Sequence, residues 1–220
     1  MFITVNGINM FYDVVGEGKP LIMVHGNGED HSIFYRAAER LKESFRCYLL
    51  DSRDHGQSTK VSMLYYTDMA EDVARFIRRL GLEKPVFYGF SDGGIIGLIL
   101  ASRYPGLLDR MIISGANMDP DGVKSWLKYM LKATTLIKND PKIKLMLEQP
   151  QLTRKDLAKI DVPVLVLAGS RDLIREAHTR RIARCIPNST LRILLGEDHG
   201  SYIVNKTRIA DLILDFCHKG

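Results

Sequence analysis

Three side chains in this sequence could together carry out nucleophilic acyl transfer: those of Ser91, Asp172 and His199. A serine hydroxyl becomes a nucleophile when a base removes its proton, and histidine, with an ordinary pKa of about 6.5, suits that role. A carboxylate that accepts a hydrogen bond from the imidazole holds the required tautomer and stabilises the imidazolium. These residue types therefore predict hydrolysis through an acyl-enzyme on Ser91.

Ser91 lies in the spacing Gly-x-Ser-x-Gly, between Gly89 and Gly93. Residues 86–90 are mainly β-branched and aromatic, and an apolar helical segment begins directly after the serine. This order predicts a strand, a tight turn and a helix, with the serine at the apex of a turn too crowded for side chains at the two glycines. The N-terminus of that helix would favour an oxyanion on an attacked carbonyl group.

Asp172 and His199 also directly follow predicted strands, which cover residues 162–168 and 191–195. These strands are expected in the interior of the sheet, so all three candidate residues are predicted to meet at the same sheet edge. Strands that alternate with helices of roughly ten or more residues predict a mostly parallel central sheet covered by helices on both faces, an α/β fold.

The length and composition predict a single α/β domain over residues 1–220, since 45% hydrophobic residues suffice for one large core. Near the N-terminus, polarity alternates around Asn6-Gly7, which predicts an antiparallel ribbon with a type I′ turn. The composition shifts over residues 119–159, and this segment is expected to form a short helical lid inserted in the domain.

Three motifs give the chain a resemblance to the α/β-hydrolase fold family that covers nearly its whole length. They are the Ser91 turn, the His-Gly-Asn-Gly motif at 25–28 after an apolar strand, and the loop at 51–58, which is similar to the family's Asp-x-Arg-Gly-x-Gly-x-Ser loop. The resemblance implies an oxyanion hole formed by the backbone N–H groups of Asn27 and Asp92. One departure is Asp54, which stands where the family's loop usually has glycine.

The acid of the triad has rivals in the sequence. Some members of the fold carry the acid after the preceding strand, but here Asn117 comes first at that position, and Asp119 and Asp121 lie nearer the lid. Asp198 is adjacent to His199 and is not expected to reach round to its ring. Asp172 is therefore the expected acid.

Asp92 places a carboxylate beside the nucleophile, and two roles for it stay open. It could simply favour the N-terminus of the helix electrostatically, a contribution of about 0.3 to 1 kcal/mol. Alternatively, the resemblance of Gly-Phe-Ser-Asp-Gly-Gly to amino-acid-ester hydrolases implies recognition of a substrate ammonium group by Asp92.

Helical spacing puts apolar side chains on one face of the first lid helix and lysines on the other; the apolar set is Trp126, Tyr129, Met130, Ala133 and Ile137. We expect the apolar face to pack over the core, where it could also border the acyl pocket. The residues expected to line that pocket are Phe90, Asn117, Met118, Trp126, Met130 and Ile174. The brevity of the lid predicts a preference for small acyl groups.

The net charge of +5 does not predict a nucleic-acid partner, because nine Lys or Arg and five Asp or Glu between residues 119 and 159 account for +4 of it. The three cysteines, Cys47, Cys185 and Cys217, lack metal-ligand spacing and are expected to be reduced thiols, so neither a metal nor a cofactor is predicted. No apolar run approaches the roughly 18 to 20 residues of a membrane span. Residues 1–6 are interpreted as a strand and not a signal peptide, which predicts a cytoplasmic location.

The sequence thus predicts a cofactor-independent serine hydrolase whose partner is a small-molecule carboxylic ester or thioester. Three other activities use the same triad and stay open: aminopeptidase-like or amino-ester hydrolysis, carbon–carbon bond hydrolysis, and perhydrolysis. A non-catalytic small-molecule receptor is the alternative of another class, since the fold also hosts such proteins. The physiological substrate and the oligomeric state do not follow from the sequence.

Overall fold

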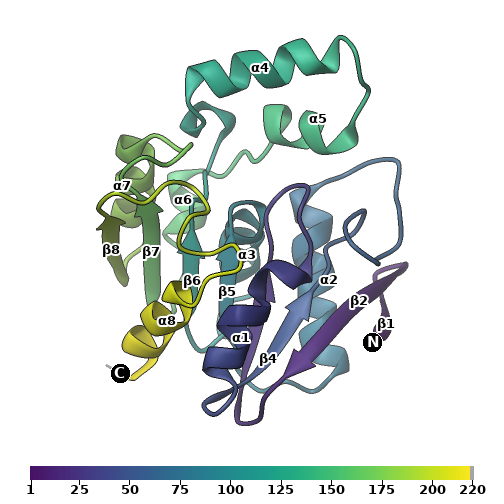
Figure 1. Cartoon of the computed structure of the whole chain (residues 1–220), viewed down its shortest axis with the longest axis vertical. Coiled ribbons are helices and arrows are strands. Elements are labelled where there is room, and N and C mark those ends of the chain that lie inside the picture. The colour runs from purple at the N-terminus through teal and green to yellow at the C-terminus, as the bar shows by residue number, and fades with distance from the viewer. Residues whose placement is uncertain (219–220) are drawn as a thin grey trace.

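The computed structural model describes residues 1–218, and within them an eight-stranded sheet has the order β1-β2-β4-β3-β5-β6-β7-β8 (Figure 1). The strands are β1 (Phe2–Val5), β2 (Ile8–Val15), β3 (Lys19–Val24), β4 (Phe45–Leu50), β5 (Val86–Phe90), β6 (Met111–Ser114), β7 (Val164–Gly169) and β8 (Ser189–Leu194). In this order, every pair from β4 to β8 is parallel, whereas β2 pairs antiparallel with both β1 and β4. The predicted mostly parallel sheet is confirmed.

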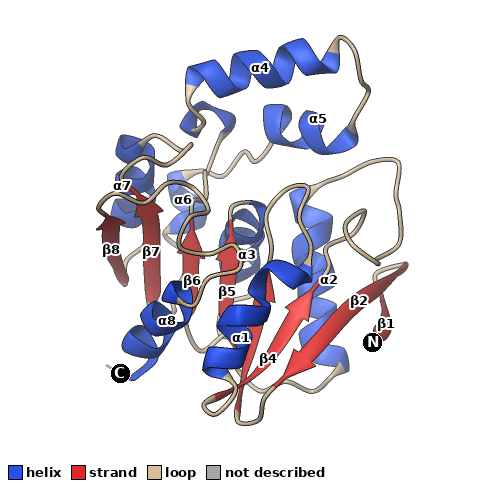
Figure 2. Cartoon of the chain, in the orientation of Figure 1, coloured by secondary structure: helices blue, strands red, loops and turns tan. Residues whose placement is uncertain are grey.

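Helices cover both faces of this sheet (Figure 2). The helices of the described chain are η1 (His31–Phe34), α1 (Tyr35–Leu41), α2 (Tyr66–Arg79), α3 (Asp92–Arg103), η2 (Pro120–Gly122), α4 (Ser125–Thr135), α5 (Pro141–Glu148), α6 (Arg154–Leu157), α7 (Glu176–Cys185) and α8 (Arg208–His218), of which α4 and α5 lie beyond the strand ends. The apolar residues of α1 and α8 share one core cluster, and those of α2, α3 and α7 share another. None of the helices in the described part of the chain is long and apolar enough to cross a membrane.

The central strands carry long apolar runs because they face both helical layers. In β3, Ile22 and Val24 belong to the α2–α3 cluster, whereas Leu21 and Met23 belong to the α1–α8 cluster. Successive side chains of a strand point to opposite faces, so a strand that is covered twice needs a continuous apolar run. Burial on both faces holds the strand ends, and hence the loops that follow them, in fixed positions.

The antiparallel ribbon predicted at the N-terminus is present. Val5 of β1 pairs with Ile8 of β2, and the two residues between them, Asn6 and Gly7, have φ of 44° and 79°. Positive φ at both central positions defines the type I′ turn, whose twist matches that of the strands it joins.

The segment between β6 and β7 contains η2, α4, α5 and α6, and α5 lies between α4 and the body of the protein (Figure 1). The prediction that α4 packs its apolar face over the core is wrong. Trp126 is 53% exposed and Met130 is 57% exposed, and no residue of α4 is fully buried. The half-buried Leu127 and Leu131 lie on the other side of the helix, so the stripe of larger apolar side chains faces solvent.

Candidate active site

Ser91 sits between the end of β5 and the start of α3 with a left-handed φ of 52°. A Cβ atom at Gly89 would lie 2.2 Å from the carbonyl oxygen of Gly93, and one at Gly93 would lie 2.0 Å from that of Val24. Both distances are far below van der Waals contact, so only glycine fits on either side of the serine. The turn thereby directs the Ser91 hydroxyl away from the sheet at the ends of the parallel strands.

The loops after β7 and β8 bring Asp172 and His199 to this turn. Nδ1 of His199 lies 2.6 Å from Oδ1 of Asp172, and Nε2 lies 3.0 Å from Oγ of Ser91. The buried Asp172 carboxylate also accepts the backbone N–H groups of Ile174 (2.9 Å) and Gly169 (3.3 Å). These two bonds fix the carboxylate, so it can hold the imidazole with Nδ1 protonated and Nε2 free to accept the serine proton.

The rival carboxylates have partners elsewhere. Asp119 accepts the backbone N–H of Asp121 at the start of η2, and Asp121 itself pairs with Lys128 of α4 at 2.7 Å. Asp198 accepts the backbone N–H groups of Gly200 and Ser201. Among the described residues, Asp172 is the carboxylate for which a bond to the His199 ring is observed.

Two neighbours position the His199 ring. Phe90 packs against it with ring centroids 5.0 Å apart. On another side is Gly115, with φ of 62°, where a Cβ atom would lie 2.7 Å from the imidazole. A larger residue at position 115 would therefore push the ring out of line with Ser91.

The loop after β3 approaches Ser91 closely, and His25 holds it in place. Nε2 of His25 accepts the backbone N–H of Ser52, and Nδ1 donates to the carbonyl oxygen of Gly26 at 2.8 Å. Burial lowers the pKa of His25 to about 4. The imidazole is therefore neutral at pH 7, and its role is to hold the loop that presents the N–H of Asn27.

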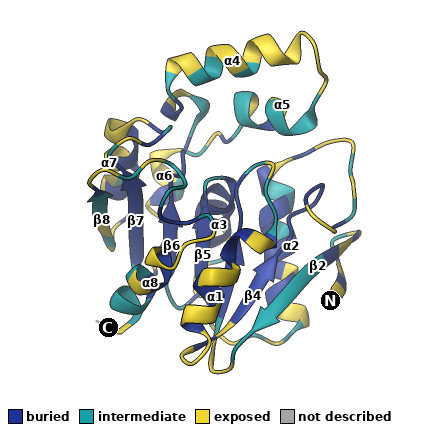
Figure 3. Cartoon of the chain, in the orientation of Figure 1, coloured by how far each residue is buried: buried dark blue, intermediate teal, exposed yellow. Residues whose placement is uncertain are grey.

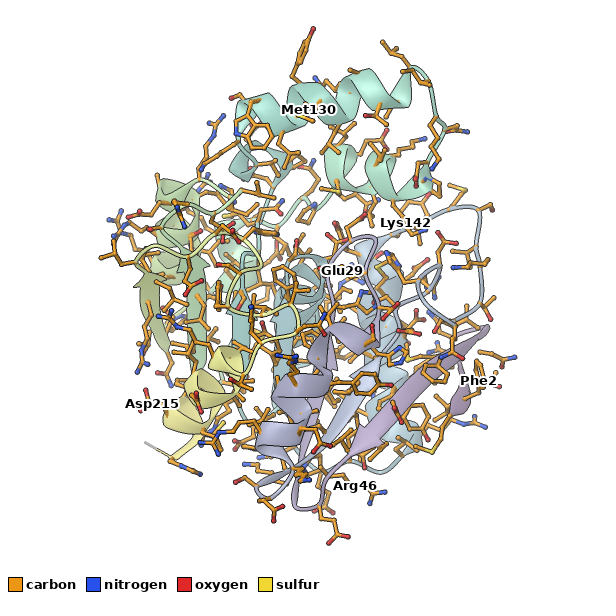
Figure 4. All side chains as sticks on the ribbon, in the orientation of Figure 1. Phe2, Glu29, Arg46, Met130, Lys142 and Asp215 are labelled. Carbon is orange, nitrogen blue, oxygen red and sulfur yellow. The ribbon has the colours of Figure 1, made fainter. Side chains whose placement is uncertain are left out.

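Glu29 also holds this loop, and sequence reasoning missed it. Its Oε2 accepts the backbone N–H of Gly26 at 3.0 Å, and burial raises the pKa of the carboxyl group. Glu29 and Lys142 of α5 both lie in the region between the lid and the strand ends (Figure 4). No local sequence pattern marks Glu29, because its importance depends on the fold of the loop back onto Gly26.

Asp92 is buried, and both of its carboxylate oxygens accept hydrogen bonds. Oδ1 accepts from the Tyr66 hydroxyl at 2.7 Å, and Oδ2 accepts from Nδ2 of Asn27 at 2.9 Å. Burial raises the pKa of Asp92, and the two hydrogen bonds oppose that rise. The Asn27–Asp92 bond joins the two residues whose backbone N–H groups are expected to form the oxyanion hole, so it sets their relative position.

A small cavity lies over the Ser91 hydroxyl, with about 30 Å³ of water-accessible volume. Its walls are mostly apolar and come from distant segments: Tyr66, Ser91, Asp92, Asn117, Val123, Leu127, Met146, Gln149, Leu173, Ile174 and His199. A single water molecule requires roughly 10–15 Å³ of water-accessible volume. The cavity therefore suits a group of a few non-hydrogen atoms, such as an acetyl group.

The expected pocket residues divide into three sets. Asn117 and Ile174 border the cavity. Phe90 and Met118 are buried in the core beside it, and Trp126 and Met130 lie on the outer side of α4, so these four do not line it. Leu127 of α4 and Met146 of α5 border the cavity where Trp126 and Met130 were expected, because the inner side of α4 is formed by its leucines.

Replacing Leu127 by Ala is expected to enlarge the cavity toward α4. Each methylene that gains burial contributes about 0.8 kcal/mol, so kcat/KM for a butyrate ester relative to an acetate ester should rise by up to about tenfold. Trp126→Ala, one residue earlier at a site that is 53% exposed and outside the cavity, is the matched control and should leave this ratio unchanged. A rise with Trp126→Ala, or none with Leu127→Ala, would mean that the lid adopts another pose during turnover.

The N-terminal end of α5 is tied to two loops of the body. Lys142 forms an ion pair with Asp54, and its carbonyl oxygen accepts Nδ2 of Asn27 at 3.3 Å. Asp54 has φ of 64°, the left-handed conformation that explains why glycine is usual at this place in the loop. The chain thus carries a strained aspartate here whose carboxylate holds the lid.

Lys142→Ala is expected to loosen the lid. The pair is partly buried, so its loss should make opening easier by about 1 kcal/mol, or roughly fivefold in the open population. We expect kcat/KM for a hexanoate ester relative to acetate to rise severalfold, with Lys144→Ala on the same helix as the control. Identical acyl-chain profiles for the two variants would show that the ion pair does not restrain the lid.

Asp30, His31 and Asp51 are the group of potential metal ligands found among the described residues. Oδ1 of Asp51 already accepts from the backbone N–H and the Nδ1 of His31, both at 2.8 Å, and Oδ2 accepts from the backbone N–H of Gln57. Because these donors occupy both oxygens of Asp51, the group is a hydrogen-bond network that shapes the loop at 51–58.

The sheet order, the strand–turn–helix at Ser91 and the loops that meet there define an α/β hydrolase. Residues 19–144 match the family model for the alpha/beta hydrolase fold. The chain therefore belongs to the alpha/beta hydrolase fold family and is a hydrolase.

Individual relatives agree with this assignment. The AB hydrolase superfamily protein YisY of Bacillus subtilis is 29% identical, over 95% of this chain and 95% of its own. The serine hydrolase BPHL of Homo sapiens is 26% identical, over 97% of this chain and 84% of its own. A thermophilic esterase from Thermogutta terrifontis superposes with a TM-score of 0.81 at 22% identity, covering 100% of this chain and 98% of its own.

Proposed function

We propose that this hydrolase cleaves small carboxylic esters or thioesters through an acyl-enzyme on Ser91. The observation that carries the proposal is the line of hydrogen bonds from Asp172 through His199 to Ser91, which ends at the cavity. The order of acid, imidazole and hydroxyl is that of a serine nucleophile with its base.

In the first half of the reaction, Nε2 of His199 takes the proton from Oγ of Ser91 as the oxygen attacks the acyl carbon. The negative charge that develops on the carbonyl oxygen is stabilised by the backbone N–H groups of Asn27 and Asp92 and by the N-terminus of α3. The tetrahedral intermediate collapses when His199 returns the proton to the leaving alcohol or thiol. Ser91 then carries the acyl group as an ester.

In the second half, His199 removes a proton from a water molecule that attacks the acyl-enzyme. The same backbone N–H groups stabilise the second oxyanion, and the proton on His199 passes to Oγ of Ser91 as the acid leaves. Asp172 stays ionised throughout and stabilises the imidazolium in both halves. No step requires a cofactor.

The cavity favours a short acyl chain, since it is small and its walls are largely apolar. Amino-ester hydrolysis receives less support. Both oxygens of Asp92 already accept neutral donors, Tyr66 and Asn27, so an ammonium group would have to compete with bonds that are already formed.

Labelling by a fluorophosphonate, together with turnover of p-nitrophenyl esters from acetate to octanoate, tests the proposal. We expect labelling at Ser91 and the highest kcat/KM for acetate or propionate. Labelling without turnover of any ester would identify a receptor that retains the triad, and a preference for octanoate would contradict the small-acyl assignment. Comparing the propionate and alanine esters tests Asp92, because recognition of an amine would favour the alanine ester.

A further inference from the structure

The outer side of the lid carries a row of exposed apolar side chains, called here the lid stripe: Trp126, Tyr129, Met130, Leu136 and Ile137. Tyr129 is 77% exposed, Leu136 is 88% exposed and Ile137 is 91% exposed. Single exposed apolar residues are common on protein surfaces, but a contiguous group of this size marks an interaction surface. Figure 3 shows that α4 is mostly exposed along its length.

The lid stripe does not line the active-site cavity. None of its residues borders the cavity, which α4 reaches through Leu127, and α5 lies between part of α4 and the body of the protein (Figure 1). No described segment of the chain covers it, and its members repeat at intervals of three and four residues, as on one helical face. Within the described residues, the lid stripe is therefore open to a partner.

The charge of the lid indicates what that partner is. Residues 124–144 contain six lysines and one acidic residue, Asp140, and no acidic residue occurs between 122 and 139. Lys128, Lys138 and Lys142 pair with Asp121, Asp140 and Asp54, and no ion pair is observed among the described residues for the other three, Lys124, Lys132 and Lys144. A helix with lysines, a tryptophan and aliphatic side chains in this arrangement has the composition of one that lies in a membrane interface.

We propose that the lid stripe docks on an anionic lipid surface, with Trp126 and Tyr129 at the level of the headgroups and the lid lysines on lipid phosphates. A second copy of the chain fits less well, because a symmetric contact would bring the same lysines together. An anionic membrane supplies both an apolar layer and the opposite charge. Docking through α4 would turn the side of the protein that holds the Ser91 cavity toward the lipid.

Trp126 is the single tryptophan of the chain, so its fluorescence reports directly on the lid stripe. We expect its emission to shift to the blue when vesicles of phosphatidylglycerol and phosphatidylcholine are added, and the protein to co-sediment with them. Vesicles of phosphatidylcholine alone, or 0.5 M NaCl, should reduce binding about tenfold or more, because screening removes the attraction to the lysines. Equal binding to both vesicle types would overturn the charge argument.

Two variants separate the lid stripe from general surface hydrophobicity. Tyr129→Ser combined with Ile137→Ser should weaken vesicle binding about tenfold or more, while Leu195→Ser, at a site 90% exposed beyond β8, should leave it unchanged. Both proteins should retain the wild-type circular dichroism and melting temperature. The proposal fails if Trp126 shows no blue shift, if the two variants bind alike, or if the double variant only abolishes a dimer seen by light scattering. Binding is measured without substrate, so its outcome is independent of the proposed reaction.

Discussion

Ser91→Ala is expected to lower kcat for p-nitrophenyl acetate by a factor on the order of 10⁴ or more and to abolish fluorophosphonate labelling. The variant loses the oxygen atom that we propose forms the acyl-enzyme, and the histidine and aspartate then have no hydroxyl to activate. Because alanine also has a Cβ atom, it tolerates the left-handed conformation at position 91 about as well as serine does. We therefore expect the melting temperature to change by no more than a few degrees.

The exposed serine Ser44, replaced by Ala, is a suitable control and should retain full activity. Residual turnover by Ser91→Ala above a tenth of the wild-type rate would exclude Ser91 as the nucleophile. A large loss of helix signal would instead mean that the turn depends on the serine for folding, and covalent labelling of the wild-type protein would then decide its role.

Asp172→Asn is expected to lower kcat by about 10⁴, the magnitude known for this change in a serine–histidine–aspartate triad. The carboxylate accepts Nδ1–H of His199 and two backbone N–H groups at once. An amide can offer one acceptor oxygen only, and its NH₂ group would favour the tautomer with the proton on Nε2. That tautomer cannot take the proton of Ser91.

Asp119→Asn is the matched comparison, because the acid could have followed the preceding strand. Asp119 accepts the N–H of Asp121 and does not contact His199, so its replacement should change kcat less than threefold. If Asp119→Asn proves the more damaging of the two, the acid has been assigned to the wrong strand end.

The prediction of the fold from the sequence depended on local rules that the structure obeys. Continuous apolar runs such as β3 form only where a strand is covered on both faces. The turn at Ser91 requires glycine at positions 89 and 93, since a Cβ atom at either would overlap the backbone. Asp172 and His199 each follow a strand of the parallel sheet. Because the C-terminal ends of parallel strands lie at the same edge of a sheet, the sequence alone predicts that the two residues lie close together.

The walls of the cavity could not be predicted in the same way. Tyr66 comes from α2, Met146 from α5 and Gln149 from the C-terminal cap of α5, and no motif links them to Ser91. Glu29 is likewise marked by nothing in its neighbourhood, because its contact with Gly26 exists only after the loop has folded. Such contacts depend on the packing of whole elements against one another.

By itself, the sequence determined that the protein is a hydrolase with a mostly parallel α/β sheet and with a serine on a strand–helix turn, because these features follow from steric limits and from the periodicity of side chains. Only the tertiary structure decided which way the lid helix faces. Helical spacing defines a stripe on α4 but carries no information about what lies beneath the helix. Since the inner side of α4 is formed by the half-buried Leu127 and Leu131, the stripe that includes Trp126 and Ile137 is exposed to solvent.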